Sequence, residues 1–430
     1  MNRIVFPSRL SGTIDAIPSK SASHRAVLMA ALAQGTTDIE PLLLSQDIRA
    51  TLDCCQQLGI TEGVVMNRGE YPDLVRVRIL GRAGDTGIRS LRVLDCGESG
   101  STLRFLIPLA LDGRGPVRFT GHGRLMQRPL HLYESMFRPQ GVRWELKGDE
   151  LLIDGRLNPG EYEMPGDVSS QFVTGLLLAL PLLDAGSRII LTSPLQSFAY
   201  VELTRLIQSE YGIRSFWEND RQSLVIPGRQ VPRSPRHLKI EGDWSQAAFY
   251  LTAGALGDSS VSVTGLPRSA SQSDSAILDI LGLMGAEIRI SDDKITVMSS
   301  RLHSATVDCS QCPDIVPILS VAMAAAGGES RITGAHRLRL KESDRLSAVR
   351  QALNAVGGRC EETEDGLLIR GGLPLHGGTV NGCGDHRIVM AMAIASALSD
   401  EPVIISDAES VAKSDPAFWD EFSMLGGKWQ

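Results

Sequence analysis

The sequence predicts a mixed α/β protein of two domains, in which apolar helices are buried and short β-strands lie outside them. Three observations support this prediction. The chain has 430 residues, which is too long for one ordinary hydrophobic core. Six segments repeat one plan at a regular spacing. The helix in each repeat is apolar on most of its faces, as expected of a helix surrounded by other structure.

Composition indicates a soluble globular protein and argues against a dedicated nucleic-acid binder. The hydrophobic content is 43% and the charged content is 22%, which are ordinary for a globular chain. A net charge of −7 and 5% aromatic residues lack the basic surplus and stacking rings of a nucleic-acid interface. The most apolar run, FVTGLLLALPLL, is too short to cross a bilayer. The start has no apolar signal region and the seven cysteines have no framework spacing, so we expect a cytoplasmic protein with reduced thiols.

Each repeat begins with polar residues, continues through an Ala/Leu/Met-rich helix, turns at Gly or Asp, and ends in a short β-branched strand. The turn residues lie 71 to 78 residues apart: Gly35, Gly113, Gly186, Gly257, Gly328 and Asp400. Alternating segments between the helices, such as RVRILG and LLIDG, predict further strands. Three such units make a domain of ordinary size. The Pro- and Arg-rich stretch 226–243, between repeats three and four, predicts a linker, with a basic binding patch as the alternative.

The polar starts of these six helices predict an anion-binding site. Unpaired N–H groups and the positive end of the helix dipole attract anions at helix N-termini. Six such ends turned toward one interdomain cleft would build a strongly anion-attracting site. The cations are concentrated at these ends although the whole chain is acidic.

Five motifs in the first half place polar and cationic side chains at such positions. They are PSKSASHR, GESGSTLRF, RPL, GDVSSQF and QSFAY. Taken singly, each motif is also explained by helix capping, a tight turn or a structural contact. PSKSASHR lacks the two-glycine frame of a P-loop, so it gives no support to triphosphate binding.

The second half adds carboxylates to the cations. RLKESDR packs five charged side chains into seven positions at a helix start, where ion pairs in a solvated turn are the ordinary explanation. Asp314 opens an apolar helix as a dipole-stabilised cap or, opposite a hydroxyl, as a general base. His386 in DHR has no second ligand at i+3 or i+4, so an orienting role is favoured over metal binding. Cys309 and Cys312 in CSQC favour two buried thiols over a zinc or redox site.

Taken together and in this order, the motifs resemble the 5-enolpyruvylshikimate-3-phosphate synthases, a family of shikimate-pathway enolpyruvyl transferases. The resemblance runs from SKSASHR to VAKSDP, and the combination of SSQF, KESDR and DHR is specific. It implies a two-domain inside-out α/β barrel of six βαβαββ-type repeats, with helices inside and sheets outside. The start of the chain returns to the second domain in this family. We therefore expect one domain at 18–240 and another at 1–17 plus 241–430, each with three repeats.

The family's reaction moves the enolpyruvyl group of phosphoenolpyruvate onto the 5-hydroxyl of shikimate 3-phosphate and releases phosphate. The resemblance implies a monomeric transferase of aromatic amino-acid biosynthesis that binds two small molecules in an interdomain cleft without a metal or cofactor. Two phosphates and two carboxylates need several cations and amide donors. Proton transfers at the methylene carbon and the hydroxyl need positioned acids and bases.

The resemblance also implies a role for individual residues. Those that would hold shikimate 3-phosphate are Lys20, Ser21, Arg25, Ser169, Ser170, Gln171, Ser197, Tyr200, Asp314, Arg337 and Lys341. Those that would hold phosphoenolpyruvate are Lys20, Gly100, Arg128, Gln171, Arg345, His386, Arg387 and Lys413. Asp314 would take the hydroxyl proton, and Glu342 with Lys20 would handle the proton at the methylene carbon.

Four positions depart from the family's pattern. Glu98 stands where Asn is familiar and Phe105 where Pro is common, Arg337 replaces an Asn that often contacts shikimate 3-phosphate, and His24 replaces another Asn. An acid near phosphoenolpyruvate would repel it unless the acid is paired or turned away. We expect these changes to alter affinity more than reaction type.

Two other functions are alternatives. The UDP-N-acetylglucosamine enolpyruvyl transferases share the fold and phosphoenolpyruvate, but they typically carry a reactive Cys on a loop of the first domain. The corresponding stretch 111–129 contains no Cys. A non-catalytic polyanion-binding protein would use the same cationic helix ends, but Asp314 and Glu342 would repel a polyanion.

Overall fold

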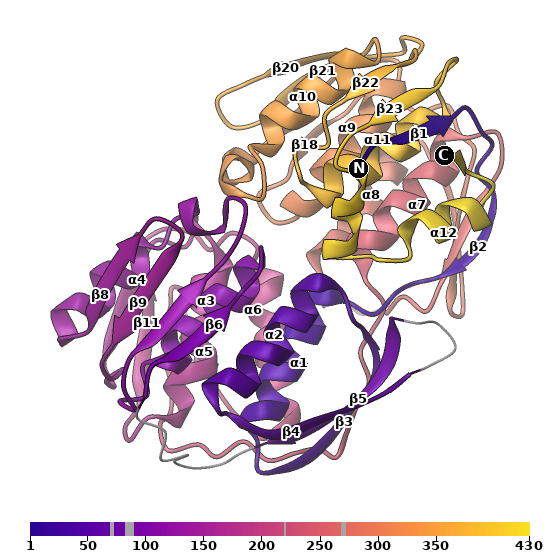
Figure 1. Cartoon of the computed structure of the whole chain (residues 1–430). Coiled ribbons are helices and arrows are strands. Elements are labelled where there is room, and N and C mark those ends of the chain that lie inside the picture. The colour runs from indigo at the N-terminus through magenta and orange to yellow at the C-terminus, as the bar shows by residue number, and fades with distance from the viewer. Residues whose placement is uncertain (69–72, 82–89, 219–220, 268–271) are drawn as a thin grey trace. The chain divides into compact units, whose positions relative to one another are not determined.

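The computed structural model describes residues 1–68, 73–81, 90–218, 221–267 and 272–430, and it divides the chain into two compact units (Figure 1). Unit 1 consists of Met1–Ser19 and Glu241–Gln430, and unit 2 consists of Lys20–Ile240. Each unit has a hydrophobic core of its own. The chain therefore starts in unit 1, builds the whole of unit 2, and then returns.

Unit 2 contains six α-helices and three four-stranded sheets among its described residues. The helices are α1 (Lys20–Leu32), α2 (Gln46–Leu58), α3 (Gly100–Ala110), α4 (His131–Phe137), α5 (Ser170–Ala179) and α6 (Phe198–Glu210). The sheets, in strand order, are β14 (His237–Leu238), β3 (Gly35–Leu43), β5 (Leu74–Gly81) and β4 (Thr61–Arg68); β6 (Arg92–Asp95), β7 (Val117–Thr120), β9 (Glu150–Asp154) and β8 (Arg143–Lys147); and β10 (Glu161–Met164), β11 (Ser187–Leu191), β13 (Ser223–Ile226) and β12 (Phe216–Trp217).

Unit 1 repeats this arrangement among its described residues. Its helices are α7 (Trp244–Leu256), α8 (Ala276–Leu283), α9 (Val316–Ala325), α10 (Arg345–Ala355), α11 (His386–Ala397) and α12 (Phe418–Met424). Its sheets are β16 (Glu287–Ser291), β17 (Lys294–Met298), β15 (Val261–Thr264) and β2 (Gly12–Asp15); β18 (Thr306–Asp308), β19 (Gly328–Thr333), β21 (Leu367–Gly371) and β20 (Arg359–Glu362); and β22 (Gly378–Val380), β23 (Val403–Ile405), β1 (Arg3–Phe6) and β24 (Lys428–Trp429).

All six sheets share one pairing pattern, which is the structural form of the sequence repeat. In the sheet of β6 to β9, for example, β6 pairs in parallel with β7, and β7 and β8 both pair antiparallel with β9. The strands alternate buried and exposed residues, as β6 does over Arg92–Asp95, so one face of each sheet packs on the core. The predicted α/β class is confirmed, whereas the closed inside-out barrel stays a prediction.

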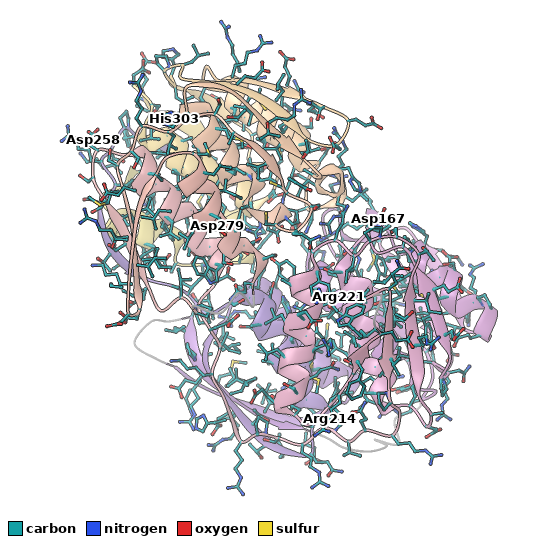
Figure 2. The ribbon with its side chains drawn as sticks, turned by 180° about the vertical axis from the view of Figure 1, so that it is seen from behind. Asp167, Arg214, Arg221, Asp258, Asp279 and His303 are labelled. Atoms are coloured by element: carbon teal, nitrogen blue, oxygen red, sulfur yellow. The ribbon has the colours of Figure 1, made fainter. Side chains whose placement is uncertain are left out.

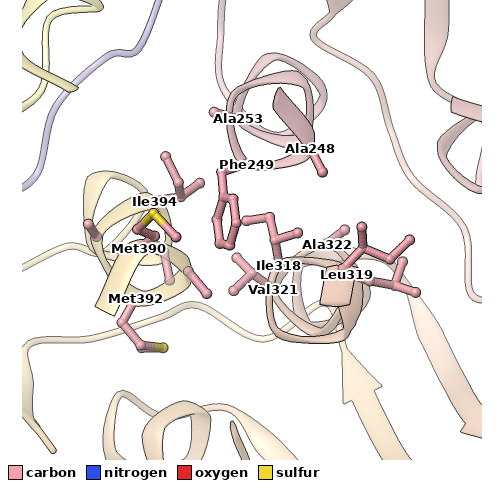
Figure 3. Packing of buried hydrophobic residues seen from close by; sticks show 14 of the residues in the cluster. Ala248, Phe249, Ala253, Ile318, Leu319, Val321, Ala322, Met390, Met392 and Ile394 are labelled. Atoms are coloured by element: carbon pink, nitrogen blue, oxygen red, sulfur yellow. The ribbon is translucent and has the colours of Figure 1, made fainter. Parts of the chain in front are cut away.

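The repeat helices are buried on nearly every face, as their composition predicts. All twelve residues of α11 are buried, and so are twelve of the thirteen residues of α7. Figure 3 shows Phe249 of α7 pointing between Ile318 of α9 and Met390 of α11. Charged side chains instead gather on the surface, as Asp258, Asp279 and Arg214 show (Figure 2). Among the described residues, every helix is too short or too polar to cross a lipid bilayer.

The Pro- and Arg-rich stretch 226–243 is hydrogen-bonded into unit 2 for most of its length. Its strand β14 pairs in parallel with β3. Gln34 exchanges backbone hydrogen bonds with this stretch, donating to the Pro232 carbonyl over 2.9 Å and accepting from the Ser234 N–H over 3.0 Å. The crossing to unit 1 lies near the end of the stretch, between Ile240 and Glu241.

Replacing Phe249 by Ala is expected to destabilise unit 1 by about 3–5 kcal/mol, because it leaves a cavity among three buried helices. Urea unfolding followed by circular dichroism measures this change. Phe216→Ala is the control, since Phe216 is 52% exposed, and it should change the free energy of unfolding little. An equal loss in both variants would contradict the packing shown in Figure 3.

Candidate functional site

Two clusters of charged side chains, one in each unit, contain half of the predicted site residues. The cationic cluster of unit 2 consists of Lys20, Arg25, Arg104 and Arg128 with Gln171. The carboxylate cluster of unit 1 consists of Asp314, Glu342 and Asp385 around Arg345, with Lys341 and Arg387. Both clusters lie at the starts of repeat helices, where backbone N–H groups lack partners within the helix.

Lys20 is the first residue of α1, and its ammonium group lies 3.1 Å from Oδ2 of Asp47 at the start of α2. Both side chains are largely buried. Asp47 therefore fixes the position of the Lys20 ammonium group. The next residue, Ser21, directs its carbonyl oxygen toward Arg25, which donates to it from Nη1 over 2.7 Å.

Arg25 connects α1 to α5 and α6. Its Nε donates to the Thr204 hydroxyl over 2.7 Å, and its Nη2 donates to the Thr174 hydroxyl and the Tyr200 carbonyl. The guanidinium also lies 5.1 Å from the centre of the Phe105 ring. Burial lowers the pKa of Arg25 to about 10, because these partners are neutral and do not balance its charge.

Arg128 rests directly on the backbone of Gly100, the first residue of α3. A Cβ atom added at Gly100 would lie 2.6 Å from Nη1 and 2.7 Å from Cζ of Arg128. Any side chain at this position would displace the guanidinium, so the glycine allows Arg128 to lie against the start of α3. Gly100 and Arg128, which the sequence assigns to the same ligand, are thus in contact.

Arg104 positions Gln171. Its Nη1 donates to Oε1 of Gln171 over 2.6 Å, and its Nη2 donates to the Pro129 carbonyl. Nε2 of Gln171 in turn donates to the Ser101 hydroxyl over 3.0 Å. The amide of Gln171 is therefore oriented by α3, although the residue belongs to α5.

The three polar residues of SSQF open α5. Ser169 is the N-cap, and its hydroxyl accepts from the Gln171 N–H over 3.3 Å. Ser170 is the first helical residue and is buried. At the start of α6, Ser197 has a left-handed backbone with φ of 55°, and Tyr200 supplies the carbonyl that Arg25 reaches. Of the predicted residues, Ser21 of α1 and Tyr200 of α6 therefore contact Arg25 through their carbonyl oxygens, whereas the contact from α5 is made by Thr174.

In unit 1, a single buried guanidinium holds three carboxylates. Arg345 is 1% exposed, and its Nη1 donates to Oδ1 of Asp314 over 2.9 Å. Its Nη2 donates to Oε2 of Glu342 over 2.7 Å and to Oδ1 of Asp385 over 3.2 Å, and its Nε donates to Oδ2 of Asp385 over 2.7 Å. Burial lowers the pKa of Arg345, but the three carboxylates outweigh it and the pKa is raised.

Asp314 lies in the single-turn helix η5 (Pro313–Ile315), immediately before α9. Besides Arg345, Lys341 lies 3.4 Å from Oδ1 and Arg387 lies 3.4 Å from Oδ2. Burial raises the pKa of Asp314, but Arg387, Lys341 and Arg345 together hold it well below its usual range. Asp314 is therefore an ionised carboxylate that can accept a proton.

Asp385 is fully buried and joins two segments. As the N-cap of α11 it accepts from the Arg387 N–H over 3.0 Å. It also accepts from the Ser343 hydroxyl over 2.9 Å and from Arg345. DHR and KESDR, which are about 40 residues apart in the chain, thus meet at this carboxylate.

The mixed charges of KESDR divide between two tasks. Asp344 is the N-cap of α10 and accepts from the Ser347 N–H over 3.2 Å. Its carboxylate also lies 3.3 Å from Arg339. Asp344 therefore stabilises the helix start, while Lys341, Glu342 and Arg345 form the carboxylate cluster.

The remaining predicted residues of unit 1 contact backbone carbonyls or lie beside the cluster. Lys413, at the end of η7 (Ala408–Lys413), donates to the Gly384 carbonyl over 2.6 Å, just before DHR. His386 opens α11, and its Nδ1 lies 3.9 Å from Oδ1 of Asp385. Arg337 donates to the Ser310 carbonyl over 2.6 Å, in the loop before η5.

Glu98 lies against a neighbouring glycine. A Cβ atom added at Gly123 would be 2.6 Å from Oε2 of Glu98, and Gly123 has φ of 59°. The carboxylate is thus packed on the loop that precedes Arg128. The segments that hold Glu98 and Gly123 continue to Gly100 and Arg128, which are also in contact with each other.

The sequence analysis did not assign site roles to Asp47, Arg104 or Asp385. Each acts through another residue: Asp47 holds Lys20, Arg104 holds Gln171, and Asp385 holds Arg345. Arg104 and Asp385 stand within the recognised motifs GESGSTLRF and DHR, which is the signal that could have found them. Asp47 stands in an ordinary helix start, and no local pattern distinguishes it.

Comparison with known proteins shows the same family over nearly the whole chain. The family model described as EPSP synthase (3-phosphoshikimate 1-carboxyvinyltransferase) matches residues 5–422. A 3-phosphoshikimate 1-carboxyvinyltransferase of Clostridium novyi is 43% identical over 426 residues, which cover 98% of this chain and 97% of the relative. One of Clostridioides difficile is 40% identical over 431 residues, covering 99% of this chain and 97% of the relative.

Solved structures show the same fold. The EPSP synthase of Acinetobacter baumannii superposes with a TM-score of 0.78 at 24% identity and covers 100% of this chain and 99% of its own. The enolpyruvyl transferase NikO of Streptomyces tendae gives a TM-score of 0.77 at 18% identity and covers 100% and 98%. With helix starts that carry SSQF, KESDR and DHR, and a family match from residue 5 to residue 422, the chain belongs to the EPSP synthase family.

Proposed function

We propose that this protein transfers the enolpyruvyl group of phosphoenolpyruvate to the 5-hydroxyl of shikimate 3-phosphate and releases phosphate. The observation that carries the proposal is the pairing of Asp314 and Glu342 on Arg345. Both carboxylates are 16% exposed, whereas the guanidinium that holds them is 1% exposed. Two accessible acid–base groups on one rigid anchor suit a reaction with two proton transfers.

The proposed reaction is an addition followed by an elimination. Asp314 takes the proton of the 5-hydroxyl while the hydroxyl oxygen bonds to C2 of phosphoenolpyruvate. Glu342, with Lys20, delivers a proton to the methylene carbon C3, which gives a tetrahedral intermediate. In the second step Glu342, with Lys20, takes a proton back from C3, the C2–C3 double bond re-forms as the bond from C2 to the phosphate oxygen breaks, and inorganic phosphate departs.

The remaining residues are proposed to bind the substrates. Shikimate 3-phosphate would be held by Lys20, Ser21, Arg25, Ser169, Ser170, Gln171, Ser197, Tyr200, Asp314, Arg337 and Lys341. Phosphoenolpyruvate would be held by Lys20, Gly100, Arg128, Gln171, Arg345, His386, Arg387 and Lys413. The positive charge of the cationic cluster supports these roles, because each substrate carries a phosphate and a carboxylate. The positive charge of Arg345 is already paired with three carboxylates. Its proposed contribution to binding is therefore its fixed position beside Asp314.

We further propose that the protein works as a cytoplasmic monomer and needs no metal or cofactor. The seven cysteines are present as thiols, which supports a reducing compartment. The division of the chain into units 1 and 2 supports a two-domain enzyme.

The first experiment measures phosphate release on mixing the protein with both substrates and with each one omitted. Release that requires both, with the enolpyruvyl product detected by mass spectrometry, is the expected result. Release with UDP-N-acetylglucosamine in place of shikimate 3-phosphate would support the related transferase. Folded protein that binds neither substrate, or that binds DNA with steep salt dependence, would refute the proposal.

Replacing Lys341 by Met is expected to move the acidic limb of the kcat profile toward higher pH. As the pH falls through the pKa of Asp314, its carboxylate is protonated and can no longer take the hydroxyl proton. Removing a cation 3.4 Å away raises that pKa. The profile is measured with both substrates saturating. Lys428→Met, at an exposed residue of β24, removes the same charge elsewhere and should leave the limb in place. A limb that moves equally in both variants, or in neither, would contradict the role of Asp314.

Replacing Glu98 by Asn is expected to lower the KM for phosphoenolpyruvate by about fivefold. The change removes a negative charge close to Gly100, where it would repel the negatively charged substrate. Steady-state kinetics with varied phosphoenolpyruvate measure this change. Glu150→Gln, at an exposed residue of β9, is the charge-matched control. Weaker binding in Glu98→Asn would show that the carboxylate does not repel the substrate.

A further inference from the structure

We propose that His24, Thr51, Thr102 and Ser99 are positioning residues that fix Lys20 relative to Gly100 and so set the geometry of the phosphoenolpyruvate half of the site. This inference rests on the proposed function. The four residues lie on α1, α2 and α3, and their side chains form one chain of hydrogen bonds, which we call the hydroxyl chain.

The hydroxyl chain is continuous and short. Nδ1 of His24 lies 2.8 Å from Oγ1 of Thr51, which lies 2.7 Å from Oγ1 of Thr102. Oγ1 of Thr102 lies 2.7 Å from Oγ of Ser99. The exposed fraction of each of the four residues is 0–1%. Because water does not reach these buried groups, their hydrogen bonds link α1, α2 and the start of α3 at fixed positions.

One part of the hydroxyl chain leads to Lys20. The carbonyl oxygen of Asp47 lies 3.2 Å from the Thr51 hydroxyl and 3.4 Å from the Thr102 hydroxyl. The carboxylate of the same residue accepts from the Lys20 ammonium group over 3.1 Å. The two hydroxyls therefore fix the backbone of the residue that places Lys20.

The other end leads to Gly100. Ser99 is the N-cap of α3, and its hydroxyl accepts from the Thr102 N–H over 3.1 Å. Gly100 follows directly and carries the guanidinium of Arg128 against its backbone. Two contacts proposed for phosphoenolpyruvate are thus attached to one buried network, Lys20 through Asp47 at its middle and the Gly100–Arg128 pair at its Ser99 end.

His24 terminates the hydroxyl chain as a neutral imidazole. Burial, with a smaller effect of Lys20 and Arg25, holds the pKa of His24 well below its usual range. Its Nε2 has no hydrogen-bond partner among the described residues, and the ring is perpendicular to that of Phe105, with the two ring centroids 6.4 Å apart. His24 and Phe105 are two of the four departures from the family's pattern, and they are in contact.

The direction of the hydrogen bonds follows from the environment of Nε2. A buried N–H group without an acceptor is rarer than a buried acceptor without a donor. The proton therefore belongs on Nδ1, which donates to Thr51, and each threonine then shares its single hydroxyl proton between the next hydroxyl of the chain and the Asp47 carbonyl. In this direction each threonine hydroxyl donates once and accepts once within the hydroxyl chain.

The kinetic test is Thr102→Val, which removes the central hydroxyl with little change of volume. We expect the KM for phosphoenolpyruvate to rise about fivefold to tenfold, as for the loss of roughly one to two buried hydrogen bonds, with kcat changed less than about twofold. The affinity for shikimate 3-phosphate alone, measured by calorimetry, should stay unchanged. Thr102→Ser keeps a hydroxyl and should restore the wild-type KM.

Thr252→Val is the matched control. Thr252 lies in α7 of unit 1, is 0% exposed, and its hydroxyl has no hydrogen-bond partner among the described residues. The variant should leave both kinetic constants unchanged. An unchanged KM in Thr102→Val, or equal losses of kcat and of shikimate 3-phosphate affinity, would overturn the proposal. If Thr102→Val does not fold, the same comparison is made with Thr51→Val, which breaks the hydroxyl chain one bond earlier.

A second test needs no turnover. Nitrogen NMR of 15N-histidine-labelled protein, with the His24 signal identified by its loss in His24→Asn, should show a neutral ring protonated at Nδ1 at pH 7. A ring protonated at Nε2, or at both nitrogens, would overturn the assigned direction. Wild-type protein that gives the expected NMR signal but does not turn over the two substrates would refute the proposed function and leave the hydroxyl chain intact.

Discussion

The organisation of unit 1 depends on the burial of one positive charge, that of Arg345. A buried guanidinium is tolerated only when carboxylates surround it with good geometry. Three segments far apart in the chain each supply one carboxylate: Asp314 before α9, Glu342 beside the guanidinium itself, and Asp385 at the start of α11. The same ion pairs that compensate Arg345 therefore bring the starts of α9, α10 and α11 together, so stability and the proposed chemistry rest on the same contacts.

Unit 2 treats its buried cation differently. Arg25 is surrounded by the hydroxyls of Thr174 and Thr204 and by two carbonyl oxygens, and none of these carries a full charge. Burial accordingly lowers the pKa of Arg25, whereas the carboxylates raise the pKa of Arg345. The charge of Arg25 is oriented but not neutralised, which suits a surface that attracts anionic ligands. The charge of Arg345 is neutralised, which suits the support of acid and base groups.

Much of this structure could be predicted from sequence because the signals are local. The spacing of turn residues and the apolar composition of the helices predict the α/β repeats, and the motifs lie at helix starts in the structure. The supporting contacts could not be predicted, because they join residues distant in sequence: Asp385 with Arg345, Arg104 with Gln171, and His24 with Thr51. The stretch 226–243 shows the same limit, since its composition predicts a linker while strand β14 pairs with β3.

The return of the chain to unit 1 has a consequence for how the protein is made. Strand β2 pairs with β15, and strand β1 pairs with β23 and β24, the last strand of the chain. Domains generally fold as they emerge from the ribosome, so unit 2, which is continuous, can be complete while the first nineteen residues still have no partner strands. The segment with β1 and β2 is thus synthesised before unit 2 but pairs only with strands synthesised after it, so during translation its unpaired strand edges need protection from a wrong β-strand partner.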